Sequence, residues 1–297
     1  MVKGKSDRIF DFLMNVLGAV MICSVIFILL FVVCASVSDP KEVAAGNVFL
    51  TPKGFNFDAY KNLLEKKDVW IGYLNSVIYT VLGTAINITI TLLTAYPLAH
   101  REFKGKSILT VIFMIPMYFS GGLVPTFLVI NGLHLYNTMW AILLPGAVVI
   151  YNIIICRTFI QTNIPYEIQE AAKIDGSNNF GIFFKIIIPL SGPIIAVLVM
   201  FFALSHWNNY FGPLIYLKDR RKFPLQIILS EILVKSSQTA IGQFLSNEEL
   251  EAAQKQADQA EMLKYALVIV SSLPFMVIYP MLQKYFVKGI MVGAVKG

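Results

Sequence analysis

The 297 residues are 57% hydrophobic and only 14% charged, far below the roughly 25% charged residues of a soluble globular domain. This composition indicates an integral membrane protein. The formal net charge of +6 does not point to a nucleic-acid binder, because the basic residues stand mostly in short segments between apolar runs, where they set membrane orientation. Three cysteines without paired spacing lie within or beside these runs, which argues against a disulfide framework or a metal site; they are Cys23, Cys34 and Cys156.

Six apolar stretches of about 20 residues have cores without Asp, Glu, Lys or Arg, and each is long enough to cross a bilayer. In chain order they are 12–35, 72–99, 108–131, 138–156, 190–212 and 265–283. The first follows three basic residues but is longer than a signal-peptide core, so it predicts an uncleaved helix. The sequence therefore predicts an all-α integral membrane protein with six transmembrane helices.

The distribution of Lys and Arg predicts that both termini face the cytoplasm. The two sets of connecting segments carry equal numbers of basic residues, but the proposed inner set is shorter and the two chain ends belong to it. The expected organisation is a cytoplasmic N-terminus (1–11), a first span (12–35), an extracellular segment (36–71), a core of five spans (72–283) and a cytoplasmic tail (284–297). Within the core, 161–189 is expected inside and 213–264 outside.

The two long outer segments contain candidate helices. We expect a short helix from Asp58 to Leu64, and a second, exposed helix from Ser246 to Glu261, where Ser246 and Glu249 form a capping-box pattern. These segments could contact an extracellular partner, or they could be solvated covers over the helix ends. Prolines and glycines recur inside the spans, where breaks often mark moving or cavity-lining parts.

No catalytic, metal or cofactor site is predicted on this chain. Lys104–Ser107 ends like a phosphate-binding loop, but His100 stands where that pattern requires its first glycine. The histidines are scattered without metal-ligand spacing. The spans also lack the intramembrane charges that ion-coupled carriers usually keep, so the energy for transport is expected to come from elsewhere.

Polar and aromatic residues within the spans are candidates for a solute path. Aromatic faces and amide groups suit a neutral, hydroxyl-rich solute such as a sugar. The same residue types also form interfacial belts and hydrogen bonds between helices, and that alternative stays open. The candidates are Asn75, Tyr79, Tyr151, Asn152, Trp207 and Asn208.

The loop 161–189 is a polar segment between two apolar spans. Pro165 suits the first turn of a helix from Tyr166 to Ile174, and Gly176 can end that helix in the left-handed conformation. Ser177 can cap a second helix that runs to Pro189. From the residues alone, this loop is either a docking segment for another protein or an amphipathic helix on the inner membrane surface.

The same loop resembles the EAA loop of binding-protein-dependent ABC importer permeases. The matching residues are Glu170-Ala171-Ala172, Gly176, Ile186 and Ile188-Pro189, with Ile188 where the family usually has leucine. The stretches Ser120–Thr126 and Gln283–Gly289 resemble the LplC/YtcP-type members of the carbohydrate branch, which are similar to the smaller permease subunit of maltose-type importers. This resemblance covers essentially the whole chain.

The resemblance implies a type I importer permease with the MetI-like fold, in which the EAA loop is a coupling helix that docks on a separate ATPase. It also implies two ATPase copies that bind ATP and Mg, a second homologous permease forming a heterodimer, and an extracellular solute-binding protein. The substrate would be a carbohydrate, such as an oligosaccharide or a polysaccharide fragment, and the location a bacterial cell membrane. The coupling residues implied are Glu170, Ala171, Ala172, Asp175 and Gly176.

Two other functions are weighed against a non-catalytic permease subunit. A self-contained secondary carrier or channel would transport in liposomes without ATP, and the charge-free spans count against it. A membrane scaffold or sensor would use the polar loop to recruit a cytoplasmic partner without transporting anything.

Overall fold

The computed structural model describes residues 4–239, 263–280 and 283, and all regular structure in these residues is helical. The chain divides into two compact units: a first unit of Met1–Val69 with Leu229–Leu273, and a second unit of Trp70–Ile228 with Pro274–Gly297. The helix expected at 246–261, with its capping box, and most of the 283–289 motif lie outside the described residues. Three described helices are long and apolar enough to cross a membrane: Asp7–Ser36, Lys67–Ala99 and Leu263–Pro280.

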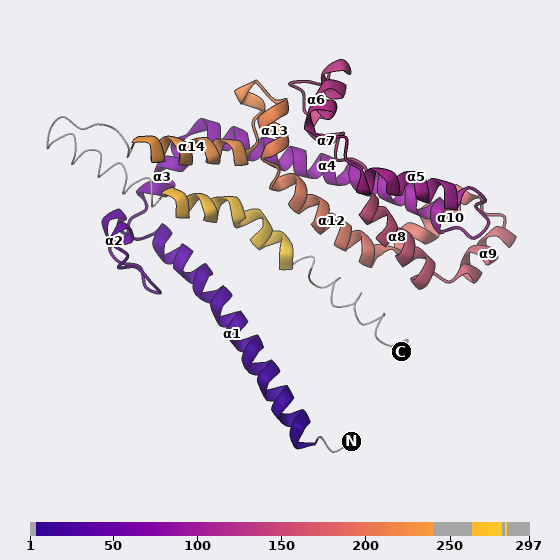
Figure 1. The fold of residues 1–297 in the computed structure, drawn as a ribbon, viewed down its shortest axis with the longest axis horizontal. Coiled ribbons are helices and arrows are strands. Elements are labelled where there is room, and N and C mark those ends of the chain that lie inside the picture. The colour runs from indigo at the N-terminus through magenta and orange to yellow at the C-terminus, as the bar shows by residue number, and fades with distance from the viewer. Residues whose placement is uncertain (1–3, 240–262, 281–282, 284–297) are drawn as a thin grey trace. The chain divides into compact units, whose positions relative to one another are not determined.

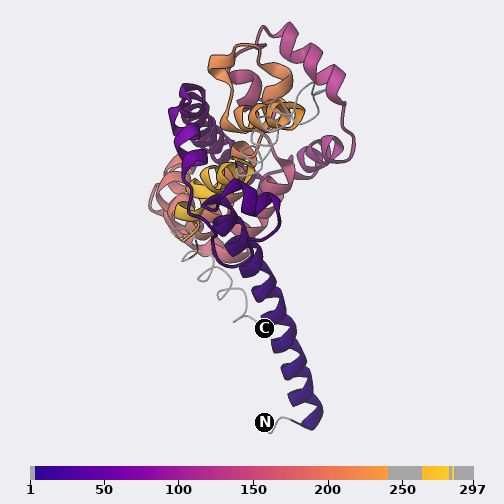
Figure 2. The same cartoon turned by 90° about the vertical axis from the view of Figure 1, so that its left-hand side faces the viewer.

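The first unit contains α1 (Lys5–Ser36), a single straight helix in both views (Figure 1, Figure 2). Its apolar side chains are exposed along most of its length, as suits a helix surrounded by lipid. Beyond α1, the short helices α2 (Pro40–Ala44) and α3 (Asp58–Glu65) fold into the expected polar segment. A small cluster of Cys34, Ala35, Val43 and Val48 holds this segment to the end of α1.

The second unit is organised along α4 (Lys67–Ala99), whose C-terminal half forms the main apolar core with several later helices. α8 (Ile150–Asn163) packs against both α5 (Lys106–Tyr118) and α12 (Gly192–Trp207). The buried side chains of this core include Leu92, Ala95, Ile153, Cys156, Ile187, Leu198 and Phe202. Figure 1 shows α9 and α10 at one end of α4 and α13 (Phe211–Tyr216) towards the other.

One of the expected spans is bent rather than straight, and another meets the loop that precedes it at a bend. The stretch expected as 108–131 is α5 followed by α6 (Leu123–Gly132), with a bend of 113° between them. Gly122 adopts a positive φ of 85° at this bend, a conformation that glycine reaches without steric cost. The helical segment Asn179–Leu190 likewise meets α12 at 77°.

The span expected at 138–156 is interrupted, and the side chain of Asn87 in α4 donates hydrogen bonds to the backbone carbonyls at the interruption. α7 (Trp140–Leu143) stops before Pro145, which lacks an amide hydrogen, and α8 begins only at Ile150. The Asn87 side-chain amide donates to the carbonyls of Gly146 (2.6 Å) and Ala147 (3.1 Å). A broken membrane helix is stable where neighbours satisfy its freed carbonyls in this way.

The same asparagine also ties α4 to α12. Its Oδ1 lies 2.7 Å from Nε2 of His206, and because the Asn87 amide nitrogen is already a donor, the imidazole Nε2 donates this bond. The ring lies so close to Gly83 that a methyl group there would overlap it. Gly83, Asn87 and His206 thus form one contact between two membrane helices.

Candidate functional site

The polar loop folds as the helix α9 (Tyr166–Ile174), whose ends are defined by two residues. Pro165 precedes the first turn as the N-cap, rather than standing within it. At the other end Gly176 has φ of 82°, and the amides of Gly176 and Ser177 donate to the carbonyls of Lys173 (3.0 Å) and Ala172 (2.9 Å). This pair of bonds is a Schellman motif. The expected glycine stop is confirmed.

A second short helix follows, and its cap differs from expectation. Asn178, not Ser177, is the N-cap of α10 (Asn179–Ile182), and its Oδ1 accepts from the amide of Gly181 at 2.7 Å. A π-helical turn (Phe183–Ile187) and α11 (Ile188–Leu190) continue the chain to Ser191. An asparagine is as good a cap as a serine, so local sequence could not choose between these neighbours.

α9 has one buried and one exposed face. Ala172 belongs to the main apolar core, and Gln169 is also buried. The other four residues expected to contact an ATPase are exposed: Glu170, Ala171, Asp175 and Gly176. Ile174 lies among them and is 86% exposed, which is unusual for a large apolar side chain on an otherwise packed element.

A single carboxylate outside α9 holds both ends of the helix. Glu102, in the loop between α4 and α5, accepts hydrogen bonds from Nζ of Lys173 and from the hydroxyl of Tyr166, each at 3.2 Å. The bond from Lys173, and then that from Tyr166, lowers the pKa of Glu102, while its pairing with Glu102 raises the pKa of Lys173. Both groups are therefore charged at neutral pH.

Two neighbours of Glu102 also contact Tyr166. The guanidinium of Arg101 lies 5.0 Å from the centre of the Tyr166 ring, and the His100 ring meets that ring edge-on at 5.8 Å. Burial, followed by the charge of Lys173, lowers the pKa of His100, so this imidazole is neutral at pH 7. Sequence reasoning missed this contact, because the two segments are more than 60 residues apart.

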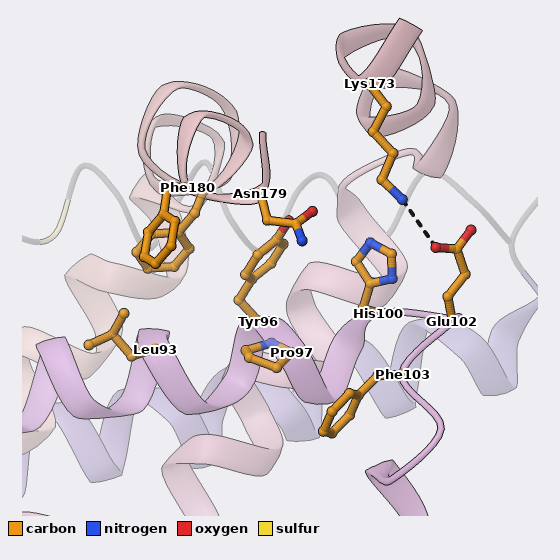
Figure 3. A pocket seen from close by; sticks show the side chains of 10 residues that line it. Leu93, Tyr96, Pro97, His100, Glu102, Phe103, Lys173, Asn179 and Phe180 are labelled. Carbon is orange, nitrogen blue, oxygen red and sulfur yellow. Dashed lines mark hydrogen bonds and ion pairs between the residues drawn. The ribbon is translucent and has the colours of Figure 1, made fainter. Parts of the chain in front are cut away.

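Cavities border α9 on two sides. One, of about 460 Å³, lies between the end of α4 and the helices α9 and α10; Figure 3 shows Tyr96, His100 and Asn179 pointing into it, with the Lys173–Glu102 pair at its edge. The other, of about 420 Å³, is lined by Ala99, Arg101, Gln161, Asn163 and Gln169, among others. α9 is thus attached to the rest of the second unit through Ala172 and through Glu102, and the two cavities lie beside these contacts.

The residues expected along a solute path do not gather in one place. Asn75 and Tyr79 lie together near the start of α4, where their side chains donate to backbone carbonyls of 221–223. Trp207 is buried against Tyr73 and Phe275. On α8, Asn152 is buried and Tyr151 is 58% exposed; Asn208, after α12, is exposed.

A smaller cavity of about 210 Å³ lies beside the Asn87–His206 contact. Its lining includes Asn87, Pro145, Ser205, His206 and Asn209. Only the tertiary structure brings these positions together. Across the described residues, no group of three or more His, Cys, Asp or Glu side chains is placed to hold a metal ion.

Comparison with known proteins finds similarity over nearly the whole chain. Residues 88–292 match the family described as binding-protein-dependent transport system inner membrane component. The polygalacturonan/rhamnogalacturonan transport system permease protein YtcP of Bacillus subtilis (strain 168) is 37% identical over 293 residues, covering 98% of this chain and 99% of that protein. The protein LplC of the same organism is 37% identical over 303 residues, covering 99% and 97%.

A solved structure is similar across nearly the whole length. It is a bacterial ABC transporter involved in the import of the acidic polysaccharide alginate, and the match has a TM-score of 0.83 with 30% identity, covering 96% of this chain and 99% of that one. The resemblance to ABC importer permeases and the all-helical membrane fold are therefore confirmed. The chain belongs to the family of binding-protein-dependent transport system inner membrane components.

Proposed function

We propose that this chain is the transmembrane permease subunit of an ATP-driven importer of carbohydrate, forming half of the translocation path. The observation that carries the proposal is α9, which is fixed to the apolar core by Ala172 while it exposes Glu170, Ala171 and Ile174. An exposed helix that is anchored to a membrane core can transmit the movement of a partner into that core. ATP and Mg would bind to the partner ATPase, whose hydrolysis supplies the energy.

The substrate proposed is an oligosaccharide or a fragment of a polysaccharide. Support comes from the names of similar proteins: YtcP is named for polygalacturonan and rhamnogalacturonan, and AraQ of Halalkalibacterium halodurans, 28% identical over the full length of both chains, is named for arabinooligosaccharides. The assembly proposed contains a second homologous permease, two ATPase subunits and an extracellular solute-binding protein. Among the path candidates, Tyr151 and Asn208 have exposed side chains that a sugar could contact.

The coupling role is tested by charging the exposed face of α9. Ile174→Asp should abolish co-purification of the ATPase with the reconstituted permease pair and remove ATP hydrolysis stimulated by the loaded binding protein, because it places a carboxylate in an apolar contact. Ile168→Asp is the matched control on the same helix, where the side chain is 42% exposed. Normal ATPase binding by Ile174→Asp would refute docking through this face.

A further inference from the structure

The larger cavity beside α9, of about 460 Å³, is bounded by several separate elements of the second unit. Leu93 and Pro97 belong to α4, Glu102 to the loop after it, Lys173 to α9 and Phe180 to α10 (Figure 3). Its volume falls within the range of roughly 300–1,000 Å³ that is usual for small-molecule sites. A molecule bound there would contact the end of α4 and the helices α9 and α10 at the same time.

Much of the cavity wall is aromatic. The ring of Tyr96 lies 5.3 Å from that of Phe183 and 6.2 Å from that of His100, measured between ring centres. Phe103 and Phe180 also line the cavity, and Phe180 is exposed although it is large and apolar. Aromatic faces pack well against flat apolar surfaces, which include the C–H faces of sugar rings.

The hydroxyl of Tyr96 is buried without a hydrogen-bond partner among the described residues. Only 9% of this residue is exposed, and its ring points into the cavity beside the side chain of Asn179 (Figure 3). Buried polar groups in folded proteins are nearly always hydrogen-bonded, so a buried hydroxyl without a partner at a cavity calls for an explanation. A hydroxyl group of a ligand in the cavity would supply the partner.

The other polar groups of the wall are neutral or paired with each other. The amide of Asn179 and the imidazole of His100 each offer a donor and an acceptor, and His100 is neutral at pH 7 because burial lowers its pKa. Lys173 and Glu102 form an ion pair at 3.2 Å, so their charges offset each other at the edge of the cavity. The cavity therefore offers hydrogen bonds of both kinds without net charge.

This combination matches an uncharged ring compound with several hydroxyl groups. We propose that the cavity is a regulatory site for a neutral mono- or disaccharide, which slows transport by holding α9 against the end of α4. A purely apolar ligand would leave the Tyr96 hydroxyl without a partner, and a charged ligand would meet only a lysine and a glutamate that already pair with each other.

The regulatory effect follows from the position of the cavity. A ligand that binds one arrangement of its walls more tightly than another shifts the protein towards the first arrangement. Any movement of α9 relative to α4 changes the shape of this cavity, so a bound sugar opposes that movement. The proposal rests on the proposed importer function, under which this side of the protein is cytoplasmic. Sugar that accumulates inside would then limit further import.

Binding is tested on the complete complex in phosphatidylcholine nanodiscs, without ATP and without the binding protein. The probes are galactose and galactobiose, and galacturonate is the matched charged compound. Equilibrium dialysis should show that galacturonate binds about tenfold more weakly than galactose, because burying its carboxylate without a counter-ion is unfavourable.

Two substitutions remove single hydrogen-bonding groups from the cavity. Tyr96→Phe deletes only the hydroxyl, and Asn179→Leu replaces the amide with an apolar group of similar size. Each should weaken binding of galactobiose about three- to tenfold through the loss of one hydrogen bond. Tyr96→Phe should leave the thermal stability of the complex unchanged, because its hydroxyl has no partner to lose. The matched control is Tyr136→Phe, whose ring packs against Phe127 and does not line this cavity, and it should bind galactobiose normally.

The regulatory effect is measured in proteoliposomes with the ATPase subunits outside and the loaded binding protein sealed inside. Galactobiose added outside then reaches only the ATPase side. It should lower ATP hydrolysis by the wild type about two- to fivefold at saturation, because it shifts the population towards the bound arrangement. The same concentration should inhibit Tyr96→Phe less, and its hydrolysis without added sugar should equal that of the wild type.

Three outcomes would overturn the proposal. The first is equal galactobiose binding by the wild type, Tyr96→Phe and Asn179→Leu, which would place the sugar elsewhere. The second is tighter binding of galacturonate than of galactose. The third is binding that leaves ATP hydrolysis unchanged, which would refute regulation. Failure of the importer function is distinguishable, because ATP hydrolysis would then not respond to the loaded binding protein even without added sugar, whereas the dialysis result would stand.

Discussion

Single residues determine how α9 is presented. Ala172 allows close approach to the apolar core because it has only a methyl side chain, and Gly176 turns the chain away so that the helix ends in an exposed position. Ile174 stands between them as an apolar residue without a covering element among the described residues. The helix therefore presents an apolar contact surrounded by carboxylates.

Substitution of Gly176 tests the role of its backbone conformation. Gly176→Ala should cost about 1–2 kcal/mol, because a φ of 82° is strained for a residue with a Cβ, although the space around that Cβ is open. The measurement is the thermal stability of the purified complex, together with ATP hydrolysis stimulated by the loaded binding protein. Both should fall.

The control for Gly176 is Gly132→Ala in α6, where the space is also open and φ is not positive. Gly176→Asn should lie between the two, since asparagine tolerates the left-handed region better than other residues with side chains. Equal stability of the two alanine variants would show that the turn does not depend on glycine.

At the scale of elements, the loop between α4 and α5 is a second connection from α9 to the membrane core. Its carboxylate, Glu102, contacts the first residue of α9 through Tyr166 and the last turn through Lys173. Movement of α9 as a rigid body must therefore displace this loop or break these contacts. The cavities beside α9 leave space for such a displacement.

A charge exchange tests this connection. Glu102→Lys and Lys173→Glu should each weaken the coupling of ATP hydrolysis to transport, because each places like charges at 3.2 Å. The double exchange should restore it. Since both side chains are solvent-exposed, thermal stability should barely change. Coupling is measured as sugar transported per ATP hydrolysed, and failure of the double variant to recover would argue against the ion pair.

The ion pair between Glu102 and Lys173 stabilises the fold only within a defined pH range. The pKa of Glu102 is lowered from its ordinary value of 4.5. The stability that its carboxylate adds to the fold is therefore present above that pH and is lost as pH falls through the lowered pKa. The pKa of Lys173 is raised from 10.5, so its contribution is present below that pH and is lost as pH rises through the raised pKa. The pair is complete at every pH between these limits.

At the scale of the whole molecule, the length of α4 predicts which side of the membrane each end of this helix faces. If α9 meets an ATPase, the end of α4 beside α9 is cytoplasmic and its other end lies outside. In a background in which Cys23, Cys34 and Cys156 are replaced by alanine, Ser177→Cys should react with a membrane-impermeant maleimide only from the cytoplasmic side. Lys218→Cys should react only from outside. The part of α4 from Asn75, which donates to the carbonyls of Arg221 and Phe223, to the end of the helix at Ala99 is about 37 Å long. Reaction of both cysteines from one side would contradict the proposed topology.

The sequence by itself determined the class of protein and the position of α9. Apolar stretches of about 20 residues without charges are stable only in lipid or in a protein core, so they predicted membrane helices. The spacing of Glu170, Ala171, Ala172 and Gly176 predicted a helix that stops at a left-handed glycine. These signals are local, and each depends on residues within a few positions of one another. Length and composition did not reveal the bends and the break within the spans, because lipid-facing apolar residues look alike in straight and broken helices.

Only the tertiary structure decided which distant polar groups meet. Asn75 and Tyr79 were expected along a solute path, and in the structure they donate to the backbone carbonyls of Arg221 and Lys222, more than 140 residues later. The partners of Asn87 are backbone carbonyls at the break between α7 and α8 and a histidine of α12. The partners of α9 come from the loop after α4. Such pairings depend on how helices cross and where they break, and the periodicity of one segment contains no information about the segment that packs against it.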